Sequence, residues 1–139
     1  MYRTILVAVD GSEHARAALD RALELADAHG ARLHVLGVVD RRVRDEPCLS
    51  SAELATIEAE EAYADIMAEV EREAAGCDVD TECQVRHGIP EEEILAYADE
   101  IDADVVFLGI HGEHDTHTGG VGRRVRATCD CELRTVRGD

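Results

Sequence analysis

The chain has 139 residues, of which 45% are hydrophobic, and its formal net charge is −17. This length suits one domain, spanning residues 1–139, with one hydrophobic core. So strong a negative charge repels polyanions and argues against nucleic acid and acidic membrane surfaces as partners. No apolar run approaches the roughly 20 residues of a membrane span, and the first residues lack a signal-peptide pattern, so we expect a cytoplasmic protein.

The cysteine and lysine contents indicate the solvent in which the protein works. The five cysteines form an odd, scattered set without a C-x-x-C pair, which favours reduced thiols over a disulfide framework or a zinc site. All 14 basic residues are arginine, and lysine is absent. Charge repulsion on such an acidic surface is screened in concentrated salt, where the Debye length is about 3 Å at 1 M. We therefore hypothesise a halophilic protein that loses structure at low salt.

The N-terminal part of the chain alternates buried strands with a helix. Residues Thr4 to Val9 form an apolar, β-branched run that predicts a buried strand. A helix follows, with Ser12 as its N-cap and Gly30 as its stop. Residues Leu33 to Val39 repeat the buried-strand pattern, and a charged, exposed connection comes next. The predicted buried stripe of the helix consists of Ala15, Ala18, Leu19, Ala22 and Ala26.

The rest of the chain continues this alternation. Ser50 and Glu53 match a capping box that opens a long acidic helix ending near Gly76, with a buried stripe of Ala55, Ala59, Ala62, Ile66, Val70 and Ala74. Apolar and polar residues alternate from Val79 to Val85, which predicts a strand with one wetter side or at a sheet edge. Pro90 opens a helix that buries Ile94, Leu95, Ala98 and Ile101. The last expected elements are a buried strand at 105–108, a short helix at 123–128 and a strand at 131–136.

Alternating strands and helices predict an α/β fold in three layers, a doubly wound parallel sheet with right-handed crossovers. Ligands in such sheets bind outside the carboxyl ends of the strands, where the strand order reverses. The two most apolar strands, at 4–9 and 105–108, should be adjacent there. The turn at Asp10 and the glycine-rich segment from Gly109 to Gly122 would then face one crevice. Glycines let main-chain N–H groups converge on phosphate, although a plain surface loop would have the same composition.

Four stretches of this sequence carry a likeness to a known family: ILVAVDGSEHARAALDRALELA, LHVLGVVD, RHGIPEEEIL and ADVVFLGIHG. Together they resemble the universal stress protein family over nearly the whole chain. The resemblance implies a five-stranded, Rossmann-like α/β fold of the adenine nucleotide alpha hydrolase type, for which we expect the strand order 3-2-1-4-5. It also implies a homodimer formed mainly through the C-terminal strand. In the nucleotide-binding branch it implies ATP, usually with Mg²⁺, held by G-x-x-G, nine residues, and then Gly followed by Ser or Thr.

The resemblance assigns the base and sugar of this nucleotide to the ends of the first two strands. Asp10, with its neighbours Ala8 and Val9, would border the adenine and the ribose. Val38, at the end of the second strand, would add backbone contacts. A carboxylate such as Asp10 beside bound phosphates could also hold the Mg²⁺ ion.

The phosphate signature is only partly present. Gly109 and Gly112 match its first two glycines, and His111 stands where the family often has histidine. Two frames remain for the rest: Gly122 followed by Arg123, or, matched from the tail ATCDCELRTVR, the pair Gly119 and Gly120. The hydroxyl residue is missing in both frames. We hypothesise that Arg123, Arg124 or Arg126 supplies the phosphate contact with its guanidinium group.

The histidines suggest a second kind of site. His111, His114 and His117 recur every three residues and could surround zinc, nickel or copper, with a solvated polar loop as the alternative. The remaining histidines are expected to face solvent or to make local hydrogen bonds; they are His14, His29, His34 and His87.

Three functions are compatible with these patterns. The first is a dimeric, adenine-nucleotide-binding stress-response regulator or sensor. The second is a family member that binds no nucleotide and acts through dimerisation and partner contacts, which the missing hydroxyl favours. The third is a weak ATP hydrolase or phosphotransferase. No residue pattern positions a base or an attacking water, so we expect a binding protein rather than an enzyme.

Overall fold

The computed structural model describes residues 2–10, 13–40, 49–110 and 132–137, with the backbone alone for 40, 49–59, 110 and 137. Five strands and three helices alternate along this part of the chain until β4. Their bounds are β1 Thr4–Val9, α1 Glu13–His29, β2 Arg32–Asp40, α2 Leu49–Gly76, β3 Thr81–Gly88, α3 Pro90–Glu100, β4 Val105–Ile110 and β5 Glu132–Arg137. The predicted helix at 123–128 lies outside the described residues.

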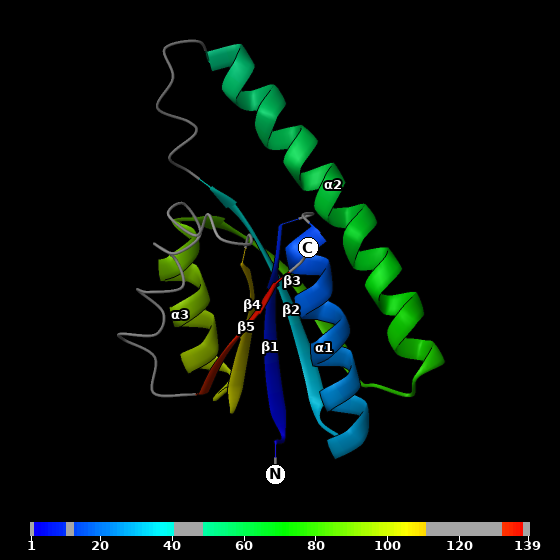
Figure 1. Ribbon diagram of the computed structural model, residues 1–139. Coiled ribbons are helices and arrows are strands. Elements are labelled where there is room, and N and C mark those ends of the chain that lie inside the picture. The colour runs from blue at the N-terminus through cyan, green and yellow to red at the C-terminus, as the bar shows by residue number, and fades with distance from the viewer. Residues whose placement is uncertain (1, 11–12, 41–48, 111–131, 138–139) are drawn as a thin grey trace.

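The strands form one parallel sheet in the order β3-β2-β1-β4-β5, which confirms the predicted fold and strand order. Figure 1 shows α1 and α2 on one face of the sheet and α3 on the other. The first and fourth strands are adjacent, as expected from their apolar sequences. The third strand, with its alternating pattern, lies at one edge.

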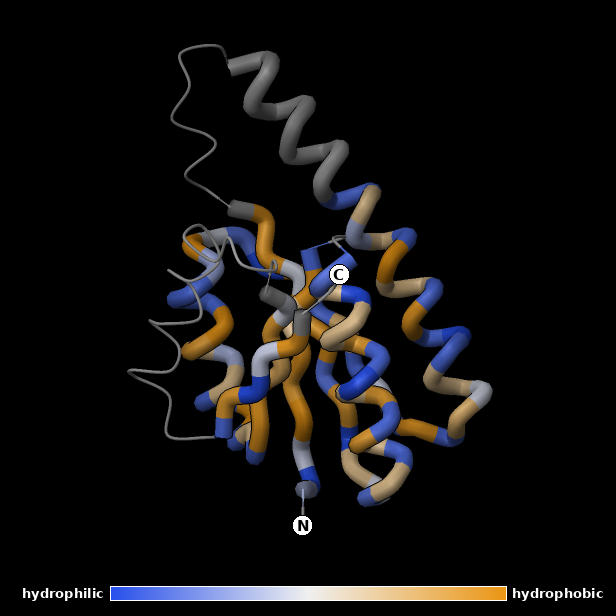
Figure 2. The backbone as a smooth tube through the Cα atoms, viewed as in Figure 1, coloured by the Kyte–Doolittle hydropathy of each residue, from blue (hydrophilic) through white to orange (hydrophobic). Residues whose placement is uncertain are grey.

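Each strand sends alternate side chains to opposite faces, so the sheet divides the hydrophobic core in two. One cluster lies under α1 and α2, and the smaller one lies under α3. Figure 2 shows the apolar strands enclosed by helices whose outer sides are hydrophilic. All five residues of the predicted stripe of α1 are buried. The strands contribute Ile5, Val7, Leu33, Val35 and Phe107 to the first cluster and Leu6, Leu36, Val106 and Leu108 to the second.

All three helices end with the same hydrogen-bonded motif. An amide two residues beyond α1, and three residues beyond α2 and α3, donates to a carbonyl five residues earlier. These bonds run from Ala31 to Ala26, from Val79 to Ala74 and from Ala103 to Ala98, at 2.9 to 3.0 Å. This Schellman geometry needs a left-handed residue in between. Gly30 fills that position after α1, as predicted, whereas Asp78 and Asp102 fill it after the other helices with φ of 59° and 52°. The turn after α2 therefore comes two residues beyond Gly76.

The orientation of α2 differs from the prediction. Ala62 is exposed, and the buried residues around it are Tyr63 and Met67. Val70 and Ala74 are buried as expected, while Ile66 is half-buried. The apolar stripe is thus rotated by about one residue along this part of the helix, because the large Tyr63 and Met67 side chains remove more apolar surface from water than alanine does.

Of the two expectations for His34, solvent exposure or local hydrogen bonds, the solvent-facing position is wrong. Its side chain lies on the α3 face of β2 with only 6% of its surface exposed. Nδ1 is 3.0 Å from the Tyr97 hydroxyl and 3.3 Å from a Glu82 carboxylate oxygen. Burial lowers the pKa of His34, although the charge of Glu82 acts in the opposite direction.

Candidate functional site

The sheet opens at the carboxyl ends of its central strands. The paired register of β1 with β4 ends at Val7 and Phe107, although β1 continues to Val9 and β4 to Ile110. The register of β1 with β2 ends at Val9 and Gly37, while β2 continues to Asp40. The last residues of β2 and β4 therefore have no paired residue in β1 among the described positions. Doubly wound sheets bind their ligands here, outside the carboxyl ends of the strands.

A glycine in β4 allows the first turn of α1 to lie against this opening. Gly109 belongs to the strand itself and not to the segment that follows, where the glycine pattern had placed it. A Cβ on Gly109 would overlap the His14 carbonyl group and lie 2.5 Å from the Ala15 nitrogen. A side chain is therefore impossible here without moving the helix. The partial positive charge of the N-terminus of α1 is thereby held beside the carboxyl end of β4, where it favours an anion.

Asp10 and His14 lie at the start of this helix. The His14 Nε2 atom is 4.0 Å from an Asp10 carboxylate oxygen. The Asp10 side chain is 57% exposed and His14 only 15%, so the carboxylate is the group that is accessible to a ligand. A carboxylate in this position can accept hydrogen bonds from hydroxyl groups or bind a cation, and it repels phosphate.

Tyr63, on α2, reaches the carboxyl end of β2. A Cβ on Gly37 would lie 2.5 Å from the Tyr63 ring, so the ring packs directly on the β2 backbone. The Tyr63 hydroxyl donates a hydrogen bond to the Val38 carbonyl oxygen at 3.1 Å. Burial raises the pKa of Tyr63, the nearby Asp10 charge adds to this effect, and the bond to Val38 opposes it.

Tyr63 was not among the residues predicted for the site. An isolated glycine inside an apolar strand indicates a close approach of another group, so Gly37 was the available signal. The sequence did not show which residue makes that approach.

The predicted contact residues lie on different sides of the sheet. Ala8 and Val38 are half-buried and pack against the cluster under α3, whereas Val9 is buried in the cluster under α1 and α2. Ala8, Val38 and Asp10 therefore lie at or just after the carboxyl ends of β1 and β2, and the Val9 side chain contributes to the core. The remaining predicted site residues, His111, Gly112, Gly119, Gly120, Gly122 and Arg123, and the histidines 114 and 117 of the metal hypothesis lie outside the described residues.

Two further observations concern the described part of the chain. It contains no group of three or more histidine, cysteine and acidic side chains placed to hold a metal ion. Among its helices, none combines the length and the apolar character needed to cross a membrane.

The sheet order defines a doubly wound α/β protein, and proteins of this class bind ligands at the topological switch point, which here lies between β1 and β4. The model of the universal stress protein family matches residues 1–137. The chain therefore belongs to the universal stress protein family, as its sequence motifs indicated.

Comparison with individual proteins agrees with this assignment. A putative universal stress protein of Staphylococcus saprophyticus is 27% identical over 141 aligned residues, covering 98% of this chain and 84% of that protein. The solved structure of universal stress protein UspA from Lactobacillus plantarum is similar with a TM-score of 0.84 and 31% identity, over 98% of both chains.

Some solved structures of the same fold contain adenine nucleotides. The universal stress protein from Archaeoglobus fulgidus in complex with dAMP aligns with a TM-score of 0.70 and 22% identity over 97% of this chain and 98% of its own. An Arabidopsis thaliana family member has AMP bound, and another universal stress protein is in complex with cAMP, with TM-scores of 0.76 and 0.73 and identities of 14% and 23%. At these identities the likeness concerns the fold.

Proposed function

We propose that this universal stress protein binds an adenine nucleotide in the crevice between β1 and β4 and acts as a stress-response sensor or regulator. The observation that carries the proposal is the close approach of Gly109 to the first turn of α1, which sets a helix N-terminus beside the opening of the sheet. The structures of family members with dAMP, AMP and cAMP support it.

The described residues suggest how the nucleoside is held. Ala8 and Val38 offer apolar surface and main-chain groups to the adenine, with the backbone of Val9 beside them. The exposed Asp10 carboxylate accepts hydrogen bonds from the ribose hydroxyls. Since this carboxylate repels phosphate, the phosphates should lie on the β4 side, at Gly109.

The residues that we propose for the phosphate contacts are taken from the sequence motif, because they lie outside the described residues. Main-chain amides near His111 and Gly112, with those of Gly119 and Gly120 or of Gly122, would surround the phosphate oxygens. Arg123 would replace the missing hydroxyl donor. We further propose that ATP is the ligand and that Mg²⁺ accompanies it, bound by the phosphates and Asp10.

Calorimetric titration of ATP, AMP and cAMP at high salt, with and without Mg²⁺, tests the proposal directly. Asp10→Ala should weaken binding by about 10- to 100-fold, the effect of losing hydrogen bonds to a charged acceptor. Asp27→Ala removes an exposed carboxylate near the other end of α1 and should leave the affinity unchanged. If no nucleotide gives a heat of binding, the result would support the alternative function, in which the protein binds no nucleotide and acts through dimerisation and partner contacts.

Arg123 can be tested in the same titrations. Arg123→Ala should weaken ATP more than AMP if its guanidinium contacts the outer phosphates. Arg72→Ala is the matched control, since Arg72 is an exposed residue of α2. Release of inorganic phosphate during prolonged incubation with ATP would instead support a hydrolase or phosphotransferase.

We also propose a cytoplasmic homodimer that assembles through β5. Strand β5 ends the sheet order, so one of its edges faces away from β4. An edge strand is a ready template for pairing with another copy. Sedimentation equilibrium at high salt should give twice the chain mass of 15.2 kDa, and a concentration-independent monomer would refute this assembly. Cell fractionation tests the location.

A further inference from the structure

From residue 60 onwards, where its side chains are described, helix α2 packs on the sheet through a short apolar segment. The buried side chains of this part are Tyr63, Met67, Val70 and Ala74, and the helix contacts β2 and β3. An open pocket of about 280 Å³ lies between α1 and α2, lined by Glu13, Arg16 and Leu19 from one helix and by Ile66 and Glu69 from the other. Polar groups beside this pocket therefore add to the apolar packing that attaches α2.

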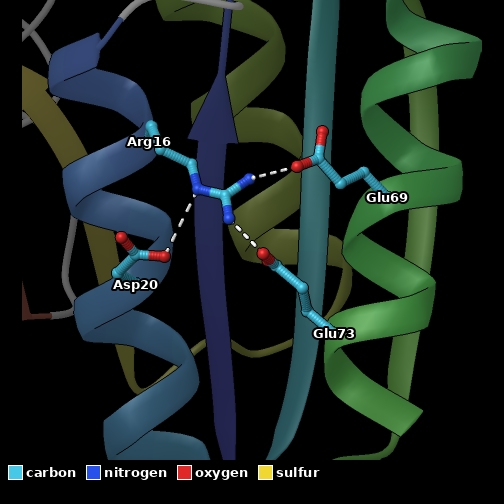
Figure 3. A network of polar contacts seen from close by, with 4 residues as sticks. All are labelled: Arg16, Asp20, Glu69 and Glu73. Carbon is cyan, nitrogen blue, oxygen red and sulfur yellow. Dashed lines mark hydrogen bonds and ion pairs between the residues drawn. The ribbon is translucent and has the colours of Figure 1, made fainter. Parts of the chain in front are cut away.

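Among the described residues, Arg16 of α1 makes polar contacts with α2 beside this pocket (Figure 3). Its guanidinium group contacts Asp20 on its own helix at 3.4 Å, Glu69 on α2 at 3.2 Å, and Glu73 on α2 at hydrogen-bonding distance. Burial lowers the pKa of Arg16, but the hydrogen bond and charge of Glu73 and the charges of the other two carboxylates outweigh it. One positive charge thus neutralises only part of three negative charges.

The two helices repel each other over a longer range. Within its bounds α2 has eight acidic residues and one arginine, and α1 has four acidic residues and two arginines. At 0.1 M salt the Debye length is about 10 Å, and it falls to about 3 Å at 1 M. Concentrated salt therefore screens the repulsion between separated carboxylates more strongly than the contact pairs of Arg16, which are about half exposed and keep part of their attraction at 3.4 Å or less. The balance between the two helices shifts from repulsion towards attraction, so we expect α2 to be held more firmly on the sheet.

Tyr63 connects this helix to the crevice. Val38, which accepts its hydrogen bond, is the first residue of β2 beyond the last pair with β1. The Tyr63 ring also lies against Gly37, the partner of Val9 in that last pair. A shift of α2 away from the sheet therefore breaks a contact at the point where the crevice begins.

We propose that α2 docks on the sheet in a salt-dependent manner and thereby stabilises the nucleotide crevice. Tyr63 is the positioning residue through which α2 acts. The proposal rests on the proposed nucleotide function and adds its regulation: a rise in salt concentration docks α2, holds the Val38 carbonyl and strengthens binding. The protein would then respond to an osmotic change without a separate sensor domain.

Hydrogen exchange of the intact protein tests the docking step without any ligand. Between 0.1 and 2 M KCl, protection of the amides at 60–76 should rise about tenfold more than that of the amides of α3, which corresponds to several surface interactions acting together. Arg16→Gln should remove most of this difference. Arg86→Gln is the matched control, because Arg86 has comparable ion pairs with Glu93 and Glu100 on the other face of the sheet. Equal salt dependence in α2 and α3, or equal effects of the two substitutions, would overturn the proposal.

Nucleotide titration at 2 M KCl tests the coupling step. Tyr63→Phe keeps the ring and loses the bond to Val38, so AMP should bind about 5-fold more weakly, the equivalent of one neutral hydrogen bond. Tyr97→Phe also removes a buried hydroxyl bond, to His34, and should have no effect on affinity. If AMP binds and the two variants are equal, the role of Tyr63 is refuted while the nucleotide function stands. If AMP does not bind the unmodified protein, both the function and the coupling fail, and the exchange experiment still decides whether salt docks α2.

Discussion

Replacing Gly109 with alanine should destabilise the protein strongly, because the new methyl group has no space. The Cβ would overlap the His14 carbonyl group and lie 2.5 Å from the Ala15 nitrogen. These atoms belong to the helix backbone, so no flexible side chain can move aside. Overpacking of this kind costs about 1 to 3 kcal/mol, and we expect about 2 to 3 kcal/mol here. At about 4 °C for each kcal/mol, the melting temperature should fall by about 8 to 12 °C.

The assay is thermal and urea unfolding in concentrated salt, with Gly76→Ala as the matched control. Nothing lies within 4 Å of a Cβ on Gly76, so that variant should be neutral or slightly more stable. Gly109→Ala should also weaken nucleotide binding, because it separates the N-terminus of α1 from β4. Equal melting temperatures for the two variants would refute the packing role of Gly109.

Three other predictions concern residues away from the crevice. The backbone amides of Arg3 and Thr4 donate hydrogen bonds to Asp104 and lower its pKa from 3.8. Asp104→Asn should therefore lower the free energy of unfolding, measured with urea at pH 7, by about 1 kcal/mol. This difference should vanish as the pH falls below 3.8 and the carboxylate of the unmodified protein is protonated. Burial raises the pKa of Cys83 to about 11, so peptide-level mass spectrometry at pH 8 should show much slower alkylation of Cys83 than of the exposed Cys77. Asp78→Gly relieves a left-handed residue with φ of 59° and should raise the urea midpoint by the equivalent of about 0.5 to 1 kcal/mol.

The fold could be read from the sequence because its strongest signals are local. The apolar run at Thr4–Val9, the stripe of α1 and the stop at Gly30 each follow from neighbouring residues, and the structure confirms all three. Alternation of strands and helices then leaves few possible topologies.

The errors arose where packing between distant segments decides. Alanine is frequent on several sides of α2, so the period of its sequence did not fix which side is buried, and contact with Gly37 selects Tyr63 over Ala62. His34 is buried because a hydroxyl 63 residues further along the chain, on Tyr97, meets its ring. Of the candidate site, the Asp10 turn and Gly109 were predicted from the strand pattern, whereas the role of Tyr63 depends on a tertiary contact.

Because all three helices end in the same type of turn, the two ends of the parallel strands should differ in their tolerance to insertions. At the end where the strands begin and the Schellman turns lie, the connections into β2, β3 and β4 have two, four and four residues. At the opposite end of the strands, the connections into α1, α2 and α3 have three, eight and one residues. Insertions and deletions in these connections leave unchanged the turns by which the chain re-enters the sheet. A chimaera that takes residues 41–48, between β2 and α2, from a relative should therefore keep its scaffold.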